Sequence, residues 1–408
     1  MTRGAPVAWV VGTFDTKAAE LDYLAGLLRA AGVRTVTVDI GTRSPPGVAD
    51  IAAREVAAHH PDGAGAVFDA TDRGVAVIAM GQALAALVRE RLAAGAIGGM
   101  LGVGGSGGSS MIAPALRLLP VGVPKLLVST MAAGDVSAYV GVSDMTLMYP
   151  VTDIAGLNRL SRTVLANAAH ALAGMLLHPV PPHDAQDKPA IGLTMFGVTT
   201  PCVQAVRALL QDDCDAQVFH ANGAGGRTLE ALAAAGMLQA VVDITTTEVG
   251  QHLAGGVCDA GPDRLDAAAR HGLPWVGSVG ALDMINWGPA STIPGRHRGR
   301  TFHVHNADVT LMRSNAQEMH AAALRIAEQL NRAAGPVRLL LPLGGLSMLD
   351  APGQPFHDPQ ANAAFFGTLQ QQFRASGDHR LIALPCHIND PAFAAALADA
   401  LRAVLSAK

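Results

Sequence analysis

The chain has 408 residues, a length typical of two or three domains. Only 15% of the residues are charged, the formal net charge is −4, and no basic run occurs, so the composition argues against a nucleic-acid-binding protein. The four cysteines include no C-x-x-C pair, which argues against a cysteine zinc site or a disulfide framework. No apolar stretch is long enough to cross a membrane, and we expect a cytoplasmic protein without membrane contacts.

Strands and helices alternate through the first half of the chain. Apolar runs that end in glycine- or hydroxyl-containing loops predict strands buried on both faces, as in a parallel sheet. The predicted strands are residues 7–11, 33–40, 97–103 and 125–129, and the predicted helices are 18–31, 75–94, one from about 110, and 154–176.

A linker is predicted at residues 177–188, where proline and polar residues concentrate. We therefore expect an N-terminal nucleotide-binding α/β domain at 1–180 and a C-terminal α/β domain at 188–408. In the second half the predicted strands are 190–196, 216–219, 240–244, 275–279, 337–341 and 380–384, with helices at 201–210, 228–235 and 316–334. The pattern predicts two doubly wound, Rossmann-like domains whose parallel sheets face a shared cleft.

The strongest local motif is the glycine-rich stretch 102–110, which follows a predicted strand and opens a helix. Exposed backbone N–H groups at such a helix start favour a phosphate or carboxylate. The candidate phosphate-binding residues are Gly104, Gly105, Ser106, Gly107, Gly108 and Ser109. A tight turn that serves only helix packing is the alternative. The spacing G-x-G-x-x-G lacks the acidic residue expected for NAD, and no Gly-Lys pair exists for a Walker A loop.

Three further strand ends supply candidates for the same nucleotide site. The loop GTFDTK contributes Gly12, Thr13, Asp15 and Lys17; Asp39 ends the second strand, and Thr130 follows the fourth. Lys17 could neutralise a phosphate, and Asp15 could hold Mg²⁺ or simply cap the helix. Asp39 could accept hydrogen bonds from a ribose or only form a turn.

The second half offers candidate catalytic residues at strand ends. His220 lies in the loop HANGAGG, a possible second anion site with Arg227 as counter-charge, and could act as an acid or base. A turn in which the His220 ring bonds to backbone is the alternative. Glu248 could be a general base or a first-turn helix acid, and Arg313 is a further polar candidate.

The motifs together resemble a known family. The motifs are GTFDTK, VTVDIGT, GVGGSGGSS and STMAAGDVSAYVGVSD, followed by HANGAGG, DITTTE, GALDM and HNADVTLMR. From about residue 7 to 393 the chain is similar to the mostly uncharacterised bacterial proteins that share the ATP-binding domain of the tomato mosaic virus resistance protein. The resemblance implies a Rossmann-like architecture, ATP binding and a homo-oligomer. It also implies a partner subunit of the phosphoenolpyruvate-hydrolase-like barrel type, because the plant protein carries such a barrel.

Two functions follow as hypotheses. The first is an ATP-binding protein with glycine-rich phosphate loops, acting as a regulatory or complex subunit. The second is an enzyme, whether hydrolase, lyase or transferase, that acts on a small carboxylated or phosphorylated metabolite in the inter-domain cleft. The number of titratable strand-end residues in the second half favours the enzyme.

Overall fold

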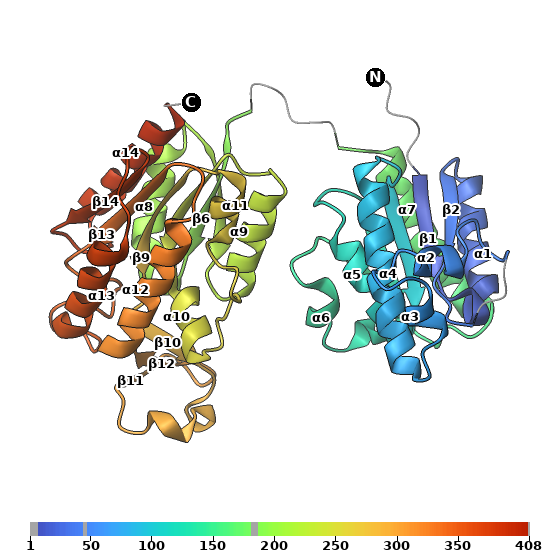
Figure 1. Cartoon of the computed structure of the whole chain (residues 1–408), viewed down its shortest axis with the longest axis horizontal. Coiled ribbons are helices and arrows are strands. Elements are labelled where there is room, and N and C mark those ends of the chain that lie inside the picture. Colours follow the sequence, from blue (N-terminus) through green and yellow to red (C-terminus); the bar gives the residue numbers. More distant parts are fainter. Residues whose placement is uncertain (1–6, 44–46, 181–186, 407–408) are drawn as a thin grey trace. The chain divides into compact units, whose positions relative to one another are not determined.

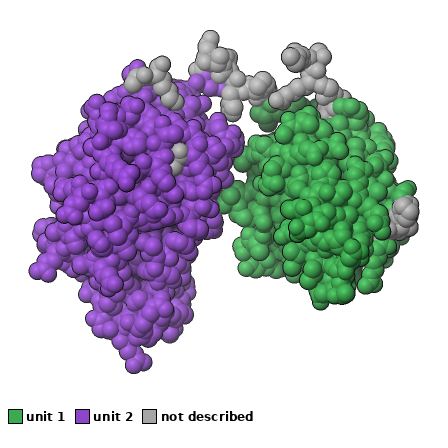
Figure 2. Space-filling model, viewed as in Figure 1, with its two compact units in different colours: residues 1–183 green, residues 184–408 purple. Residues whose placement is uncertain are grey.

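A computed structural model describes residues 7–43, 47–180 and 187–406. The chain divides into two compact units, residues 1–183 and 184–408 (Figure 2). Both units contain a sheet of parallel strands flanked by helices (Figure 1), which confirms the expected α/β class. No helix in the described ranges combines the length and apolar character needed to cross a membrane.

The first unit is built on a five-stranded parallel sheet with the order β2-β1-β3-β4-β5. Its strands are β1 Val7–Gly12, β2 Arg34–Asp39, β3 Gly99–Gly104, β4 Lys125–Ser129 and β5 Thr146–Met148. The chain runs from β1 outward to β2, then returns to β3 and continues outward on the other side. The strand order therefore reverses between β1 and β3, the position where open α/β sheets bind ligands.

Helices cover both faces of this sheet. They are α1 Phe14–Ala30, α2 Ala53–Ala57, α3 Gly65–Phe68, α4 Arg73–Ala93, α5 Ser106–Arg117, α6 Ser137–Val140 and α7 Arg159–Leu177, with a 3-10 helix at Thr130–Ala133. Alternate strand residues face opposite cores: Val11 packs with α4 and α5, whereas Val10 packs with α1 and α7. Helix α5 begins four residues earlier than the predicted start at 110. The glycines of its first turn carry no apolar periodicity, so the pattern cannot show them as helical.

The second unit contains a six-stranded parallel sheet with the order β14-β13-β9-β8-β6-β7. Its strands are β6 Ala190–Met195, β7 Asp215–His220, β8 Ala240–Thr245, β9 Trp275–Gly280, β13 Val337–Pro342 and β14 His379–Leu384. Here the order reverses between β6 and β8. A small antiparallel sheet, with the order β10-β12-β11, is inserted between β9 and β13 and was not predicted. Its strands are β10 Met284–Trp287, β11 Phe302–Val304 and β12 Thr310–Arg313.

Two helical layers enclose the larger sheet. One core contains side chains of α8 Thr200–Leu210 and α14 Pro391–Leu405. The opposite core contains side chains of α9 Ala224–Ala234, α10 Thr247–Ala254, α12 Ala316–Leu330 and α13 Pro359–Gln372. Helix α11 spans Asp266–His271, and 3-10 turns lie at Gly197–Thr199, Ala290–Thr292 and Gly295–His297. Helix α13 was not predicted, because its hydrophobic residues follow no clear helical stripe.

Candidate functional site

A pocket of about 550 Å³ lies at the carboxyl edge of the first sheet. It is lined by Thr13, Asp15, Thr16, Lys17, Thr42, Arg43, Arg73, Val77, Gly105, Ser106, Gly107, Gly108, Met111, Thr130 and Asp153. These residues come from the segments after β2, β1, β3 and β4, which include the first turn of α1, from the first two turns of α4 and α5, and from the segment before α7. The pocket therefore spans the point where the strand order reverses.

The glycine-rich start of α5 forms one wall of this pocket. Gly105 is the residue before the helix, in an extended conformation with φ −77° and ψ −160°, and it has no side chain to cap the helix. The N–H groups of the first helical turn have no acceptor within the helix. Apart from its two chain neighbours and the backbone of its own helix, no atom lies within 4 Å of the position that a Cβ on Gly107 would occupy. The N–H groups and the positive end of the helix dipole are therefore open to an anion.

The loop after β1 supplies the opposite wall. The backbone of Lys17 departs from helical geometry, with φ −136° and ψ 25°, inside the first turns of α1. Its Nζ donates to the carbonyl of Ile154 at 2.9 Å, which ties this loop to the segment that carries Asp153. A carboxylate oxygen of Asp15 accepts from the backbone N–H of Arg43 at 3.3 Å. Lys17 and Asp15 thus hold three loops in place around the pocket.

Two arginines line the same pocket. Arg43 follows β2 and Arg73 is the first residue of α4, and both are exposed. Within residues 7–43, 47–180 and 187–406, neither guanidinium makes a hydrogen bond or an ion pair. Sequence reasoning missed both arginines, together with Val77, Met111 and Asp153, because none of them belongs to a recognisable motif. Thr16 and Thr42 belong to the motifs GTFDTK and VTVDIGT but were not among the predicted site residues.

Some predicted site residues do not line the pocket. Asp39 is fully buried, and its Oδ1 accepts from the backbone N–H groups of Phe14 at 3.0 Å and Gly41 at 2.7 Å. Its carboxylate therefore joins the loops after β1 and β2. Ser109 is also fully buried, and its hydroxyl lies 2.6 Å from that of Ser129, which joins α5 to β4.

Gly12 and Gly104 serve close packing. A Cβ on Gly12 would lie 2.8 Å from a methyl carbon of Leu21, and a Cβ on Gly104 would lie 2.7 Å from the backbone of Gly108. Real Cβ contacts are essentially never this short, so a side chain at either position would displace its neighbours. The remaining predicted residues, Thr13, Asp15, Lys17, Thr130 and the loop residues Gly105, Ser106, Gly107 and Gly108, all line the pocket.

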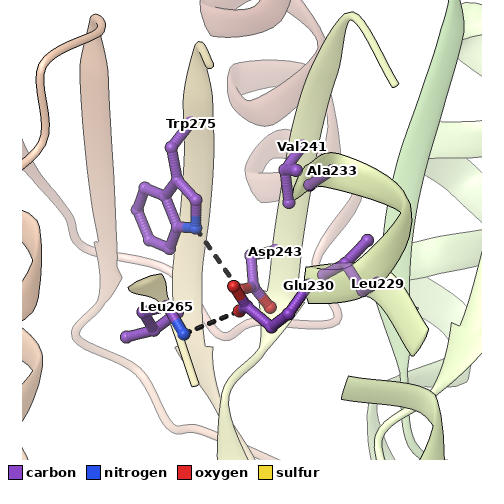
Figure 3. A pocket seen from close by; sticks show the side chains of 7 residues that line it. All are labelled: Leu229, Glu230, Ala233, Val241, Asp243, Leu265 and Trp275. Atoms are coloured by element: carbon purple, nitrogen blue, oxygen red, sulfur yellow. Dashed lines mark hydrogen bonds between the residues drawn. The ribbon is translucent and has the colours of Figure 1, made fainter. Parts of the chain in front are cut away.

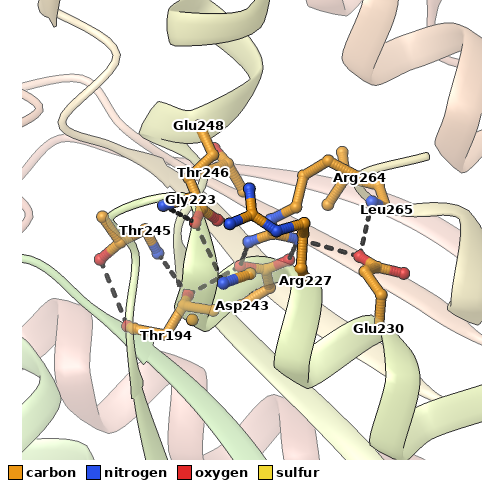
Figure 4. Close-up of polar contacts among 12 residues, drawn as sticks. Thr194, Gly223, Arg227, Glu230, Asp243, Thr245, Thr246, Glu248, Arg264 and Leu265 are labelled. Carbon is orange, nitrogen blue, oxygen red and sulfur yellow. Dashed lines mark hydrogen bonds and ion pairs between the residues drawn. The ribbon is translucent and has the colours of Figure 1, made fainter. Parts of the chain in front are cut away.

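In the second unit, Glu248 occupies the glycine-rich loop that was considered as a second anion site. Its Oε1 accepts from the backbone N–H groups of Gly223 at 2.6 Å and Gly226 at 3.0 Å, at the start of α9 (Figure 4). The carboxylate is fully buried. Arg227, the expected counter-charge, instead donates to the carbonyl of Asp259 at 2.7 Å. A side chain of the protein thus neutralises the helix start, and Glu248 has no exposed oxygen with which to act as a base.

Arg264 pairs with this buried carboxylate. Its guanidinium donates to both oxygens of Asp243 at 2.7 Å, to Glu248 at 2.7 Å and to Glu230 at 3.2 Å. Burial lowers the pKa of Arg264, but the carboxylates of Asp243 and Glu248 more than compensate and hold it well above its usual value. The cluster links β8, α9 and α10 through charge-assisted bonds.

A cavity of about 10 Å³ lies beside this cluster (Figure 3). It is lined by Leu229, Glu230, Ala233, Val241, Asp243, Leu265 and Trp275. The indole N–H of Trp275 donates to Asp243 at 3.3 Å, and the backbone N–H of Leu265 donates to Glu230 at 2.6 Å. This volume is close to the minimum for one water molecule, so the cavity cannot hold a metabolite.

The other two predicted catalytic residues lie in different surroundings. His220 is exposed on the edge strand β7, and its ring stacks on Phe196 with centroids 5.2 Å apart. Arg313 is buried on β12, where its guanidinium donates to the carbonyls of Phe356 at 2.6 Å and Ser314 at 2.8 Å. Arg313 therefore holds backbone segments together. No hydrogen bond or ion pair among the described residues joins His220, Glu248 and Arg313.

Beside Arg313 lies a buried carboxylate pair, Asp283 and Asp350. Burial, then the neighbouring charge of Asp350, raises the pKa of Asp283 to about 7. Asp283 accepts from the hydroxyl of Ser347 at 2.7 Å, and Asp350 Oδ1 lies 3.9 Å from a nitrogen of Arg313. The sequence does not predict that these two residues meet, since their proximity depends on how the segments after β9 and β13 come together.

Comparison with known proteins matches both units to domains of one protein family. Residues 6–180 match the Uncharacterised protein family (UPF0261) N-terminal domain, and residues 188–405 match the C-terminal domain of the same family. A UPF0261 protein of Mesorhizobium japonicum is 50% identical over 390 residues, covering 96% of this chain and 97% of the relative. A UPF0261 protein of Rhizobium meliloti is 51% identical over 394 residues, covering 97% and 98% respectively.

A plant protein is also related. The ToMV resistance protein Tm-1(GCR237) of Solanum lycopersicum is 40% identical over 416 aligned residues, which cover 97% of this chain but 55% of the tomato protein. Among solved structures, a Streptomyces glycosyltransferase matches with 13% identity and a TM-score of 0.18 over 67% of this chain and 81% of that protein, a likeness too low to support any inference. Because both domain families match in order along the chain, the protein belongs to the UPF0261 family.

Proposed function

We propose that the chain binds ATP in the pocket of the first unit. The observation that carries the proposal is the open, glycine-rich start of α5 in a pocket of about 550 Å³, a volume in the range typical of small-molecule sites. A phosphate placed at Gly105–Gly108 would accept from backbone N–H groups and meet the positive end of a helix of 12 residues.

The rest of the pocket suits the other parts of a nucleotide. Val77 and Met111 offer apolar contact to a base, and the hydroxyls of Thr13 and Thr130 can bond to a sugar or a phosphate. Asp15 and Asp153 are the two carboxylates in the lining, and they are the residues that would hold a Mg²⁺ ion arriving with ATP. Catalysis on a small phosphorylated metabolite in this pocket is the alternative, since the same groups would bind its phosphate.

Gly107→Val tests the proposal directly. The added side chain would fill the space above the first turn of α5, and no neighbouring atom within 4 Å obstructs it, so the fold is expected to remain intact. Isothermal titration calorimetry of the full chain should show ATP binding to the wild type and none to Gly107→Val. Gly26→Val is a matched control, because Gly26 is exposed on α1 and also has open space around it.

The outcomes separate clearly when unfolding temperatures are measured beside the titrations. Both variants should unfold near the wild-type temperature, and Gly26→Val should bind ATP normally. An unchanged ATP affinity in Gly107→Val would remove the start of α5 from the site. Binding of small phosphorylated metabolites but not of ATP would favour the enzyme hypothesis instead.

A further inference from the structure

The pocket of the first unit is longer than one phosphate group. Its lining includes residues after β2, β1, β3 and β4, which are consecutive neighbours in the sheet. Adjacent strands lie about 4.8 Å apart, so four strand ends span roughly 14 Å. A phosphate bound at Gly107 is beside β3 and leaves the β2 end of the pocket, where Arg43 lies, without an occupant.

Helix α4 brings Arg73 to this same edge of the sheet. The crossovers that lead into β3 and β4 place α4 and α5 on one face of the sheet, with Gly81 of α4 beside Met111 of α5. In parallel sheets both helices run back against the strands, so both begin at the carboxyl edge. Arg73 is the first residue of α4, and it therefore lies at the carboxyl edge of the sheet, where it lines the pocket, rather than at the far end of the helix.

Some charged groups in the pocket already have hydrogen-bond partners within the protein, whereas others do not. The Lys17 ammonium already donates to a carbonyl, and an oxygen of Asp153 already accepts from the N–H of Ile154 at 2.8 Å. Arg43 and Arg73, by contrast, have neither ion pairs nor side-chain hydrogen bonds in the part of the chain that the structure describes. An unpaired guanidinium in a concave site is suited to phosphate, because its planar donors match two phosphate oxygens.

We propose that Arg43 and Arg73 form a second anion subsite, separate from the start of α5. This inference rests on the proposed nucleotide pocket and specifies its ligand: a nucleoside di- or triphosphate rather than a monophosphate. The phosphate common to all three nucleotides lies at Gly105–Gly108, and the added phosphates of ADP and ATP lie at the two arginines. The arginines also offset the negative charges of Asp15 and Asp153, which would otherwise repel a long phosphate chain.

The test is calorimetric titration of ATP, ADP and AMP into the full chain, as wild type, Arg43→Ala, Arg73→Ala and Arg89→Ala. Arg89 is exposed on α4, outside the pocket, and serves as the matched control. Hydrogen bonds to charged groups contribute enough that losing one should weaken ATP binding roughly 10- to 100-fold. AMP affinity should stay within about twofold in every variant, and Arg89→Ala should resemble the wild type with all three ligands.

Specific results would overturn the subsite. Equal affinity of the wild type for AMP and ATP would do so, as would parallel losses for AMP and ATP in Arg43→Ala and Arg73→Ala. In both cases the proposal that the pocket binds nucleotides would still stand. The arginines would then contact the phosphate common to all three nucleotides, or no phosphate at all. If the wild type bound none of the three nucleotides, the proposed function would fail together with the subsite. Circular dichroism measures the unfolding temperature of each variant, so that weaker binding can be distinguished from a loss of folding.

Discussion

Replacing Asp283 with asparagine should change how the stability of the second unit depends on pH. Asp283 and Asp350 are both fully buried, and in the described residues neither Oδ1 atom has a hydrogen-bond partner. Arg313 is the nearest cation, but backbone carbonyls and Asn362 already occupy its guanidinium. The pair therefore carries one more negative charge than its surroundings balance, unless Asp283 holds a proton.

The pKa of Asp283 fixes both the sign and the size of the effect. Burial and the charge of Asp350 raise this pKa from 3.8 to about 7. Between these pH values the folded state holds a proton that the unfolded state has lost, so stability falls as pH rises through this window and is constant above it. Because each pKa unit is worth about 1.4 kcal/mol, the full change is on the order of 4 kcal/mol of unfolding free energy.

Asparagine preserves the shape of the side chain and an acceptor for the Ser347 hydroxyl, but it cannot ionise. The unfolding free energy of Asp283→Asn minus that of the wild type should therefore increase from pH 4 to pH 7 and then level off. Urea unfolding, followed by circular dichroism at several pH values in this range, measures the difference directly. Two stability curves that stay parallel between pH 4 and pH 7 would show that Asp283 titrates normally, and the reasoning from burial would be refuted.

Two other predictions concern buried groups of the second unit. Glu248→Ala should lower the unfolding free energy by about 3–5 kcal/mol, because it leaves Arg264 and two backbone N–H groups short of an acceptor. A change below about 0.5 kcal/mol in urea unfolding would show that Glu248 is not a structural residue. Burial, then Cys386, raises the pKa of Cys202 to about 12. Brief iodoacetamide treatment at pH 8 should therefore label Cys386, the least buried cysteine, well before Cys202, and peptide mass spectrometry showing the reverse order would contradict the burial of α8.

The main features of the fold could be predicted from the sequence because strands buried on both faces have continuous apolar runs. Strands β1, β3 and β4 are of this kind, and each was expected within two residues of its observed start. The antiparallel sheet could not be predicted in this way. Its strands β10, β11 and β12 contain only three or four residues each, too few to establish an alternating pattern.

The candidate site was partly predictable for a related reason. A glycine-rich stretch after a strand identifies the loop, but helical geometry decides which residues face outward. Ser106 begins α5 and lines the pocket, whereas Ser109, three residues later, points to Ser129 in the core. Arg43 and Arg73 reach the pocket from segments without motifs, and only the three-dimensional arrangement of the loops brings them together.

The carboxylate of Glu248 has a consequence for how glycine-rich loops are interpreted in this fold. In the second unit the anion that such a loop favours is part of the polypeptide, bound permanently to the start of α9. An external phosphate could enter there only by displacing a side chain that is also paired with Arg264, at a cost of several kcal/mol. Crystals soaked in phosphate or sulfate should therefore accumulate the ion at α5 and leave α9 empty, although the two loops look alike in sequence.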